Sequence, residues 1–226
     1  MYNNIIAIPY RKREKHLKHY IKHTVPLIQK FLPNTRVVVI EQNEGKIFNR
    51  GKILNVAFKE YENKTKYFLT NDVDLNPTQK CLEEYYKLEN DIVRILTAHR
   101  ESLGGVTKLH SKCIKEMNGF PNYIWGWGIE DRALYYRAII KKFKILETKC
   151  NKSKSNFTIL HHKTNNQVYK DEKHNISNRW RKGHINKINN EEKNKMVNDS
   201  GLNNIEYTIL ERKMIHEIVE LIYVDI

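Results

Sequence analysis

Two short acidic segments carry the residue types that could do chemistry. Residues 125–131 (WGWGIED) bring two large aromatic side chains, two glycines and an adjacent acidic pair close together. Residues 71–74 (NDVD) place two carboxylates on alternate positions at the end of an apolar run. Hard divalent cations bind carboxylate oxygens and share their remaining positions with phosphate and water. Together the segments indicate a metal-held phosphate beside an aromatic surface and a carboxylate base, which suits the transfer of a sugar from a nucleotide to an acceptor.

Each segment also has a simpler structural interpretation. Asp72 and Asp74 fit an Asx-rich turn, the two tryptophans fit a packed core, and Glu130 and Asp131 fit the acidic first turn of a helix. Glycines between tryptophans weaken any regular element, however, which favours a mobile aromatic flap that closes over a sugar. A carboxylate directly after such a flap is placed to take a proton from a sugar hydroxyl.

A pair of histidines, His161 and His162, ends the apolar stretch 157–160. Paired histidines are ordinarily surface or core residues. Imidazole combined with carboxylate and phosphate oxygen would nevertheless favour a borderline ion such as Mn2+ over Ca2+. Both interpretations stay open at this point.

Composition favours one globular domain. The chain has 226 residues, 40% of them hydrophobic and 29% charged, which is enough to bury a sizeable core. No run of about 18 apolar residues is present to span a bilayer, and the N-terminal stretch is too short and uncharged for a signal peptide. Cys81, Cys113 and Cys150 form neither a metal motif nor a disulfide framework, which favours a reducing compartment. We therefore expect a single domain over residues 1–226, without anchor, stem or signal segment.

The net charge of +14 raises the possibility of a nucleic-acid partner. Lys and Arg are spread over nearly the whole chain, however, and no zinc-finger spacing or RRM motif occurs. We therefore expect no nucleic-acid partner. A basic surface would equally suit nucleotide diphosphates, anionic glycans or peripheral contact with an anionic membrane surface.

Alternating strand and helix patterns in the first half predict an α/β domain with a largely parallel sheet. Ligands in such sheets bind beyond the carboxyl ends of the strands, where the acidic segment 71–74 lies. Pro26 is expected to kink or divide the first helix. The elements expected here are strands at 4–9, 36–41 and 66–70 and helices at 11–32 and 49–61.

The second half continues with weaker patterns. Leu134, Ala138 and Ile139 are expected to face inward on one helix. The lysine- and asparagine-rich stretch 163–200 is expected to be a long loop with one or two surface helices. The remaining expected elements are helices at 78–88, 110–117 and 129–143 and strands at 91–97, 205–210 and 218–224.

Several motifs occur in a specific order. The segments are 48–56 (FNRGKILNV), 71–75 (NDVDL), 104–106 (GGV), 118–122 (NGFPN), 125–131 (WGWGIED) and 200–207 (SGLNNIEY). In this order they resemble the β-1,4-galactosyltransferases, whose corresponding segments include FNRAKLLNVGF, (S/H)DVDL and a C-terminal DGLNSLxY. The likeness runs from Ile5 to the last residue, and coincidence is a poor explanation for six ordered motifs.

The resemblance implies a GT-A fold, in which a mostly parallel central sheet flanked by helices binds a nucleotide sugar. It also implies inversion at the anomeric centre with UDP-galactose and Mn2+. Asp131 would be the catalytic base. Arginine suits the diphosphate, because its planar fork meets phosphate with two bonds. The implied UDP-sugar contacts are Pro9, Arg11, Arg13, Phe48, Arg50, Asp72, Val73, Asp74, Gly104, Gly105 and Trp127. The implied acceptor contacts are Trp125, Trp127, Glu130 and Asp131.

Three departures from the family pattern bear on these roles. Where the family has Met-x-x-His or His-x-His, this chain reads ILHH at residues 159–162. The resemblance therefore implies Asp74 and His162 as the metal ligands, with His161 as the alternative to His162. Arg132 replaces an acidic residue of the family, which predicts altered acceptor recognition. Ser102-Leu103 replaces a Tyr-Phe pair of the animal enzymes, and a small residue there would admit UDP-N-acetylgalactosamine as an alternative donor.

The sequence therefore predicts a metal-dependent inverting glycosyltransferase that forms a β-linkage to a glycan or lipid-linked saccharide acceptor. The missing anchor, stem and disulfides predict a cytoplasmic enzyme of microbial or viral origin. Two alternatives remain. One is a catalytically inactive, lectin-like relative, and the other is a basic nucleic-acid-binding protein, which would bind with steep salt dependence.

Overall fold

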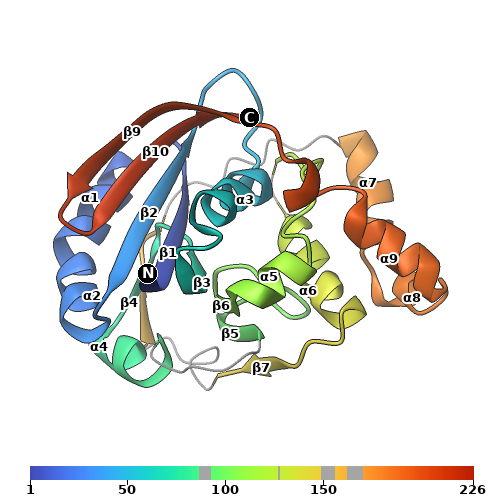
Figure 1. The fold of residues 1–226 in the computed structure, drawn as a ribbon, viewed down its shortest axis with the longest axis horizontal. Coiled ribbons are helices and arrows are strands. Elements are labelled where there is room, and N and C mark those ends of the chain that lie inside the picture. Colours follow the sequence, from blue (N-terminus) through green and yellow to red (C-terminus); the bar gives the residue numbers. More distant parts are fainter. Residues whose placement is uncertain (87–92, 127, 149–155, 162–169) are drawn as a thin grey trace.

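The computed structural model of the chain describes residues 1–86, 93–126, 128–148, 156–161 and 170–226. Helices cover both faces of an eight-stranded sheet (Figure 1). In spatial order its strands are β7 (Ile145–Glu147), β5 (Val93–Thr97), β6 (Val106–His110), β3 (Thr65–Asn71), β1 (Tyr2–Tyr10), β2 (Thr35–Gln42), β10 (Val219–Asp225) and β9 (Thr208–His216). A small second sheet pairs β4 (Leu75–Pro77) with β8 (Phe157–Ile159). The α-helices are α1 (Glu14–His23), α2 (Val25–Phe31), α3 (Arg50–Tyr61), α4 (Gln79–Cys81), α5 (Ser111–Glu116), α6 (Glu130–Ile140), α7 (Lys170–Arg179), α8 (Lys182–Ile185) and α9 (Asn190–Asn198).

The centre of the large sheet is parallel. β3, β1, β2 and β10 run in the same direction, whereas β6 is antiparallel to both of its neighbours and β9 is antiparallel to β10. The expected α/β fold with a mostly parallel central sheet is thus confirmed. The helix expected at 110–117 begins only at Ser111, because residues 106–110 form β6 between β3 and β5.

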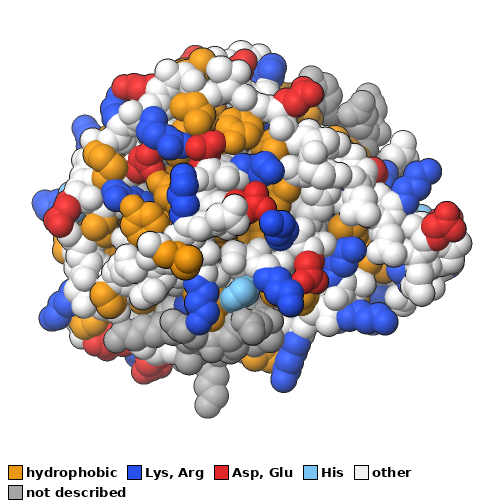
Figure 2. Space-filling view, viewed as in Figure 1, with side chains coloured by type: hydrophobic (Ala, Val, Ile, Leu, Met, Phe, Trp, Pro, Cys, Tyr) orange, Lys and Arg blue, Asp and Glu red, His pale blue; other side chains and the backbone are white. Residues whose placement is uncertain are grey.

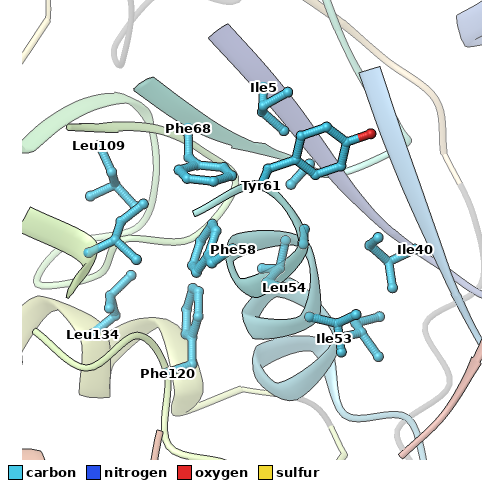
Figure 3. Packing of buried hydrophobic residues seen from close by; sticks show 14 of the residues in the cluster. Ile5, Ile40, Ile53, Leu54, Phe58, Tyr61, Phe68, Leu109, Phe120 and Leu134 are labelled. Carbon is cyan, nitrogen blue, oxygen red and sulfur yellow. The ribbon is translucent and has the colours of Figure 1, made fainter. Parts of the chain in front are cut away.

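Two apolar cores lie on opposite faces of this sheet. On the face covered by α3, the ring of Phe58 meets Phe68 edge-on at 4.9 Å between centroids and stacks on Phe120 at 6.1 Å (Figure 3). On the other face, α1 and α2 bury an apolar stripe that includes Tyr20 and Ile28. Burial on both faces explains why the central strands are nearly continuous runs of Val, Ile and Leu.

The expected division of the first helix is confirmed, with a different break point. α1 ends at His23, and α2 begins at Val25 with Pro26 in its first turn. Proline is tolerated there because the first N–H groups of a helix have no intrahelical partner. The helix expected at 78–88 is reduced to α4 and a π-helical turn at Leu82–Tyr86 within the described residues.

A third cluster gives the C-terminal helices a larger role than expected. Trp180, Ile185 and Met196 are buried against Ile124 and Ile129. Residues 163–169 of the expected surface stretch lie outside the described residues. From Lys170 on, the stretch is not only surface, because α7, α8 and α9 contribute side chains that pack with Ile124 and Ile129. On α6, Leu134 and Ala138 face inward as expected, but Ile139 is exposed.

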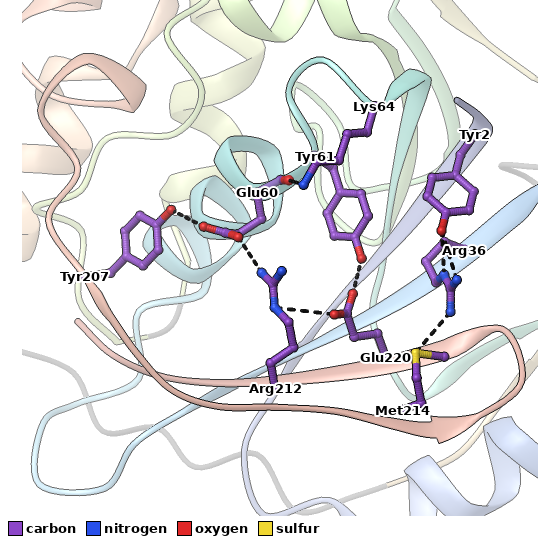
Figure 4. Close-up of polar contacts among 9 residues, drawn as sticks. All are labelled: Tyr2, Arg36, Glu60, Tyr61, Lys64, Tyr207, Arg212, Met214 and Glu220. Atoms are coloured by element: carbon purple, nitrogen blue, oxygen red, sulfur yellow. Dashed lines mark hydrogen bonds and ion pairs between the residues drawn. The ribbon is translucent and has the colours of Figure 1, made fainter.

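The C-terminal hairpin is joined to the last turn of α3 by a polar cluster (Figure 4). Arg212 on β9 lies between Glu60 of α3 and Glu220 of β10, pairing with both carboxylates. Each carboxylate also accepts a phenolic hydroxyl, from Tyr207 and Tyr61 respectively. These contacts fix β10 against β2 as the next strand of the sheet.

The basic charge is dispersed over the surface. Lys and Arg side chains are spread over the face shown in Figure 2, interleaved with acidic and apolar side chains. Within the described parts of the chain, no helix is long and apolar enough to cross a bilayer.

Candidate active site

The first turn of α3 is fixed at the carboxyl end of the sheet by an asparagine. The Asn49 side chain caps the helix by accepting from Lys52 N at 2.9 Å. Its backbone N–H donates to Gln42 Oε1 at the end of β2, and its Nδ2 donates to Asn122 O at 2.7 Å. These three bonds hold the next residue, Arg50, at the start of the helix.

The acidic segment is shaped by a second asparagine. Asn71, the last residue of β3, is fully buried and donates from Nδ2 to the carbonyls of Asp72 and Leu75. Its Oδ1 accepts the hydroxyl of Tyr86. The resulting tight turn carries Asp72 at the same edge of the sheet as the start of α3.

Arg50 lies between two carboxylates. Its Nη2 is 2.8 Å from Asp72 Oδ1, its Nε donates to the same oxygen at 2.9 Å, and its Nη1 is 3.8 Å from Glu130 Oε1. The side chains of Arg50, Asp72 and Glu130 are 12%, 32% and 7% exposed. Nη1 of Arg50 and Oε2 of Glu130 have no hydrogen-bond partner among the described residues. The cluster therefore has unused hydrogen-bonding capacity.

Burial sets the protonation of this cluster. It raises the pKa of Glu130 to about 7, with a further rise from the charge of Asp131 and opposition from Arg50. Burial also raises the pKa of Asp72 against the attraction of Arg50. For Arg50 itself burial favours the neutral form, but the surrounding carboxylates outweigh it and raise its pKa. Perturbed carboxyl groups of this kind are typical of functional sites.

The candidate base, Asp131, lies on the first turn of α6 beside the turn that precedes β6. Ser102 Oγ donates to its Oδ2 at 2.7 Å, and the backbone N–H of Arg132 donates to its Oδ1 at 2.7 Å. The backbone N–H of Leu103 donates to its carbonyl at 3.0 Å. A Cβ on Gly104 would stand 2.6 Å from Oδ2. Sequence reasoning singled out Ser102 for its small size and missed this contact with the candidate base.

The backbone before Glu130 is strained. Gly126, Gly128 and Ile129 have φ angles of 80°, 85° and 81°. For a β-branched residue such as Ile129 this conformation is a true outlier, and such outliers cluster at ligand clamps and switch regions. Gly126 N donates to Phe48 O at 2.8 Å, so this segment contacts the loop before α3. Trp127, the expected flap residue, lies outside the described residues, and Trp125 is partly buried against the α3-side core.

The expected diphosphate contacts lie along the same edge. Pro9 pairs with Ile40 near the carboxyl ends of β1 and β2, and β1 is the parallel neighbour of β3. The Arg11 guanidinium lies 5.1 Å from the centre of the Phe48 ring and donates to Lys46 O at 2.7 Å. Arg13 immediately precedes α1. Val73 is buried, and Gly105 adopts a φ of 56° with Thr97 O only 2.4 Å from where a Cβ would stand.

The small sheet brings the two expected metal-binding segments together. Leu75 pairs with Ile159, and Leu160 N donates to Asp74 O at 2.9 Å. His161 follows directly and is exposed, whereas His162 lies outside the described residues. The described residues contain no group of three or more His, Cys, Asp or Glu side chains arranged to hold a metal. Asp74 directly precedes β4 and His161 follows β8, so a carboxylate and an imidazole flank this strand pair, and residues of these types suit a borderline divalent ion that also takes phosphate oxygens.

A buried polar network, which the sequence did not predict, joins α3 and α6 to the loops beside this edge of the sheet. Asn55 of α3 donates to Phe120 O at 2.7 Å and accepts from Phe120 N at 2.8 Å. Arg137 of α6 is fully buried and donates to the carbonyls of Gly119 and Ser200. These bonds join three of the ordered motifs, which explains why those motifs are rich in Asn and Gly. Nothing in the sequence around Arg137 indicated that it is buried.

Comparison with known proteins places this geometry in a family. Residues 1–87 match the family model for the N-terminal region of glycosyl transferase group 7, and residues 87–163 match the model for the N-terminal domain of galactosyltransferase. The chain belongs to the β-1,4-galactosyltransferase family. The resemblance seen in the ordered sequence motifs is therefore confirmed.

Among curated members of the family, human β-1,4-galactosyltransferase 4 is 36% identical over 151 residues, which is 62% of this chain and 43% of that protein. Bovine β-1,4-galactosyltransferase 1 is 34% identical over 149 residues, or 62% of this chain and 37% of that protein. The chain thus spans about two fifths of the length of these relatives. These relatives are animal galactosyltransferases. The expectation of a cytoplasmic enzyme of microbial or viral origin is therefore wrong.

Solved structures agree on the fold. The catalytic domain of Drosophila β-1,4-galactosyltransferase 7, in a complex with xylobiose, superposes with a TM-score of 0.76 at 22% identity over 100% of this chain and 94% of that one. A mutant of the same enzyme with manganese, UDP-Gal and xylobiose gives a TM-score of 0.77 at 20% identity with the same coverage. At this identity the likeness establishes the GT-A type of fold and nothing further.

Proposed function

We propose that the chain is an inverting glycosyltransferase that moves galactose from UDP-galactose to a hydroxyl of a glycan acceptor with the help of Mn2+. The observation that carries the proposal is the meeting of Arg50, Asp72, Glu130 and Asp131 at the carboxyl edge of the sheet, in a chain of this family. An edge of this kind is where α/β domains bind nucleotides.

The diphosphate of the donor would be bound by basic side chains. Arg50 has a guanidinium nitrogen without a hydrogen-bond partner in the described residues. Arg11, stacked on Phe48, and Arg13 stand along the same edge and supply further positive charge. These groups would stabilise the UDP leaving group, on which negative charge develops during transfer.

Asp131 would act as the general base. It accepts the proton of the acceptor hydroxyl while that oxygen forms its bond to the anomeric carbon. The bond between the anomeric carbon and the β-phosphate oxygen breaks, and UDP leaves with the electron pair. Attack from the face opposite UDP converts an α-linked donor into a β-linked product.

Asp74 with His162, or His161 in its place, would hold the metal. When bound, the ion would supply positive charge to the diphosphate of the donor. Support comes from the pairing of β4 with β8, which joins the Asp74 backbone to Leu160.

Sugar and acceptor recognition would come from the segment around the candidate base. Trp125, Trp127 and Glu130 would contact the acceptor, with Gly104 and Gly105 beside the donor sugar. UDP-N-acetylgalactosamine remains an alternative donor, and a lipid-linked saccharide remains an alternative acceptor. If the acceptor is a lipid-linked saccharide, it lies at a membrane, and the basic surface of the protein would favour contact with anionic lipids there.

The test is a screen of UDP-galactose, UDP-N-acetylgalactosamine and UDP-glucose for Mn2+-dependent hydrolysis, in which water replaces the unidentified acceptor. We expect release of UDP from one of the first two, and its loss in EDTA. Asp74→Ala should abolish Mn2+-dependent UDP binding in calorimetry, whereas unchanged binding would refute its metal role. Metal-dependent UDP binding without turnover in any screen would identify an inactive lectin-like relative. The absence of UDP binding would overturn the proposal altogether.

A further inference from the structure

The two oxygens of Asp131 are held by different groups. Oδ1 accepts the N–H of the next residue, Arg132, which is a contact local to the chain. Oδ2 accepts a hydroxyl from Ser102, which is far away in the sequence and on a separate turn before β6. The second contact is therefore built by the fold and not by local helix geometry.

The hydroxyl of Ser102 has a fixed direction. Its Oγ accepts the N–H of Gly104 at 3.1 Å, which occupies a lone pair of the oxygen. A hydroxyl has one proton to donate, and with Gly104 N on one side that proton is directed to Asp131 Oδ2. The residue is only 3% exposed, so water does not compete freely for this proton.

The surrounding turn is shaped to this contact. A Cβ on Gly104 would collide with Oδ2 at 2.6 Å and would stand 3.2 Å from Ser102 Oγ. Leu103 N donates to the backbone carbonyl of Asp131 at 3.0 Å, which joins the turn to α6 a second time. Oδ2 is thus held by the Ser102 hydroxyl and has room because the adjacent Gly104 lacks a side chain.

We propose that Ser102 is a positioning residue for Asp131: its hydroxyl fixes the rotamer of the carboxylate, so that a remaining lone pair is held in a fixed direction for the acceptor hydroxyl. The inference rests on the proposed function and deepens it. During transfer the acceptor proton moves to Asp131, and the Ser102 proton stays on Oγ. A carboxylate has about four lone-pair sites, so two remain after the bonds to Ser102 and Arg132.

Other charges surround the carboxylate as well. Glu130 and Arg132 flank it on α6, Arg50 faces it from α3, and Asp72 faces it from the turn after β3. These groups remain in a Ser102 variant, so a change in kcat on removing the hydroxyl is not caused by the loss of one of these charges.

The experiment compares the wild-type protein with Ser102→Ala, Ser102→Thr and Ser102→Cys in Mn2+-dependent hydrolysis of UDP-galactose. We expect Ser102→Ala to lower kcat about tenfold to hundredfold, as for the loss of a hydrogen bond to a charged group, with KM for UDP-galactose unchanged. Ser102→Thr, which keeps the hydroxyl, should restore most of kcat. Ser111→Ala on the first turn of α5 is the matched control and should behave as wild type.

A double-mutant cycle separates positioning from folding. In an Asp131→Asn background, Ser102→Ala should cause no further loss of kcat; an equal loss in both backgrounds would overturn the inference, as would a wild-type kcat in Ser102→Ala. If Ser102→Ala does not fold, the nearly isosteric Ser102→Cys, a weak donor, takes its place with the same expected loss of kcat. Failure of the proposed function is distinguishable, because then the wild-type protein itself releases no UDP from UDP-galactose.

Discussion

Each end of α3 carries an arginine between two carboxylates. The two clusters differ in how many of their polar atoms have hydrogen-bond partners. At the carboxyl end, Arg212 lies between Glu60 and Glu220, and both carboxylates also accept a tyrosine hydroxyl. At the amino end, Arg50 lies between Asp72 and Glu130 with hydrogen-bonding atoms left over.

The difference separates a structural cluster from a binding one. Arg212 is 38% exposed, and every oxygen of its two carboxylate partners already has a partner within the protein. The Arg50 cluster is more deeply buried, and buried polar atoms without partners cost free energy. A site that tolerates this cost is prepared for groups that arrive with the substrate. Variants at the two ends of one helix therefore test this contrast.

The largest expected effect is on transfer at the amino end. Asp131→Asn should lower kcat for UDP-galactose hydrolysis by about a hundredfold to ten-thousandfold, because the acceptor proton then has no base. Binding of UDP, measured by calorimetry, should persist. At the other end of the helix Glu220→Gln should leave kcat unchanged. Unchanged kcat in Asp131→Asn would rule out its assignment as the base.

A smaller contrast concerns affinity for UDP. Arg50→Ala should weaken UDP binding about tenfold to hundredfold, since bonds between charged groups are lost. Arg212→Ala is the matched control: it should leave UDP affinity intact but lower the free energy of unfolding, because Glu220, whose side chain is 10% exposed, loses its cationic partner. Equal UDP affinities in the two variants would remove the distinction between the clusters.

The next contrast is in pH dependence. The pKa of Glu130 is about 7 in the folded protein against 4.5 for the free side chain. The folded state then binds the proton more tightly than the unfolded state, so this residue contributes a loss of stability as pH rises from 4.5 through 7, on the order of 3 kcal/mol. Glu130→Gln should flatten the dependence of the unfolding free energy on pH over this window, as chemical denaturation at several pH values will measure. A slope equal to that of the wild type would show that Glu130 is not the titrating group.

The smallest expected effect is at the carboxyl end alone. Tyr207→Phe removes the hydroxyl that donates to Glu60 at 2.6 Å. The free energy of unfolding should fall by about 1 kcal/mol, with UDP binding and kcat as in the wild type. A loss of UDP affinity in this variant would mean that the two ends of α3 are coupled.

The strands and the helix that carry the site were predictable because their patterns are local. β1, β2, β3 and α3 lie within about two residues of the expected ranges, since buried runs and helical spacing are visible in the sequence. β6 was missed because three of its five residues, Thr107, Lys108 and His110, are polar, and Lys108 is nevertheless buried with its Nζ donating to Tyr86 O. Trp180 is likewise a core residue in a stretch dominated by Lys and Asn.

Within the site, the motifs predicted which residue types meet but not which atoms bond. Asp72, Arg50 and Glu130 were expected at one site, and the structure brings their side chains together. The bond from Ser102 to Asp131 joins two turns distant in the sequence and has no local pattern. Arg137, held by backbone carbonyls instead of an acidic partner, offers no charge pattern to find.

The position of β10 between β2 and β9 has a consequence for synthesis of the chain. β2 is the neighbour of β1 on one side, but its other edge is covered only by a strand from the very end of the sequence. While the ribosome is still making the rest of the protein, the apolar run Val37–Ile40 presents an open edge to other nascent chains. Early release, or truncation before β10, would leave that edge available for aggregation even though every residue proposed for catalysis is already present.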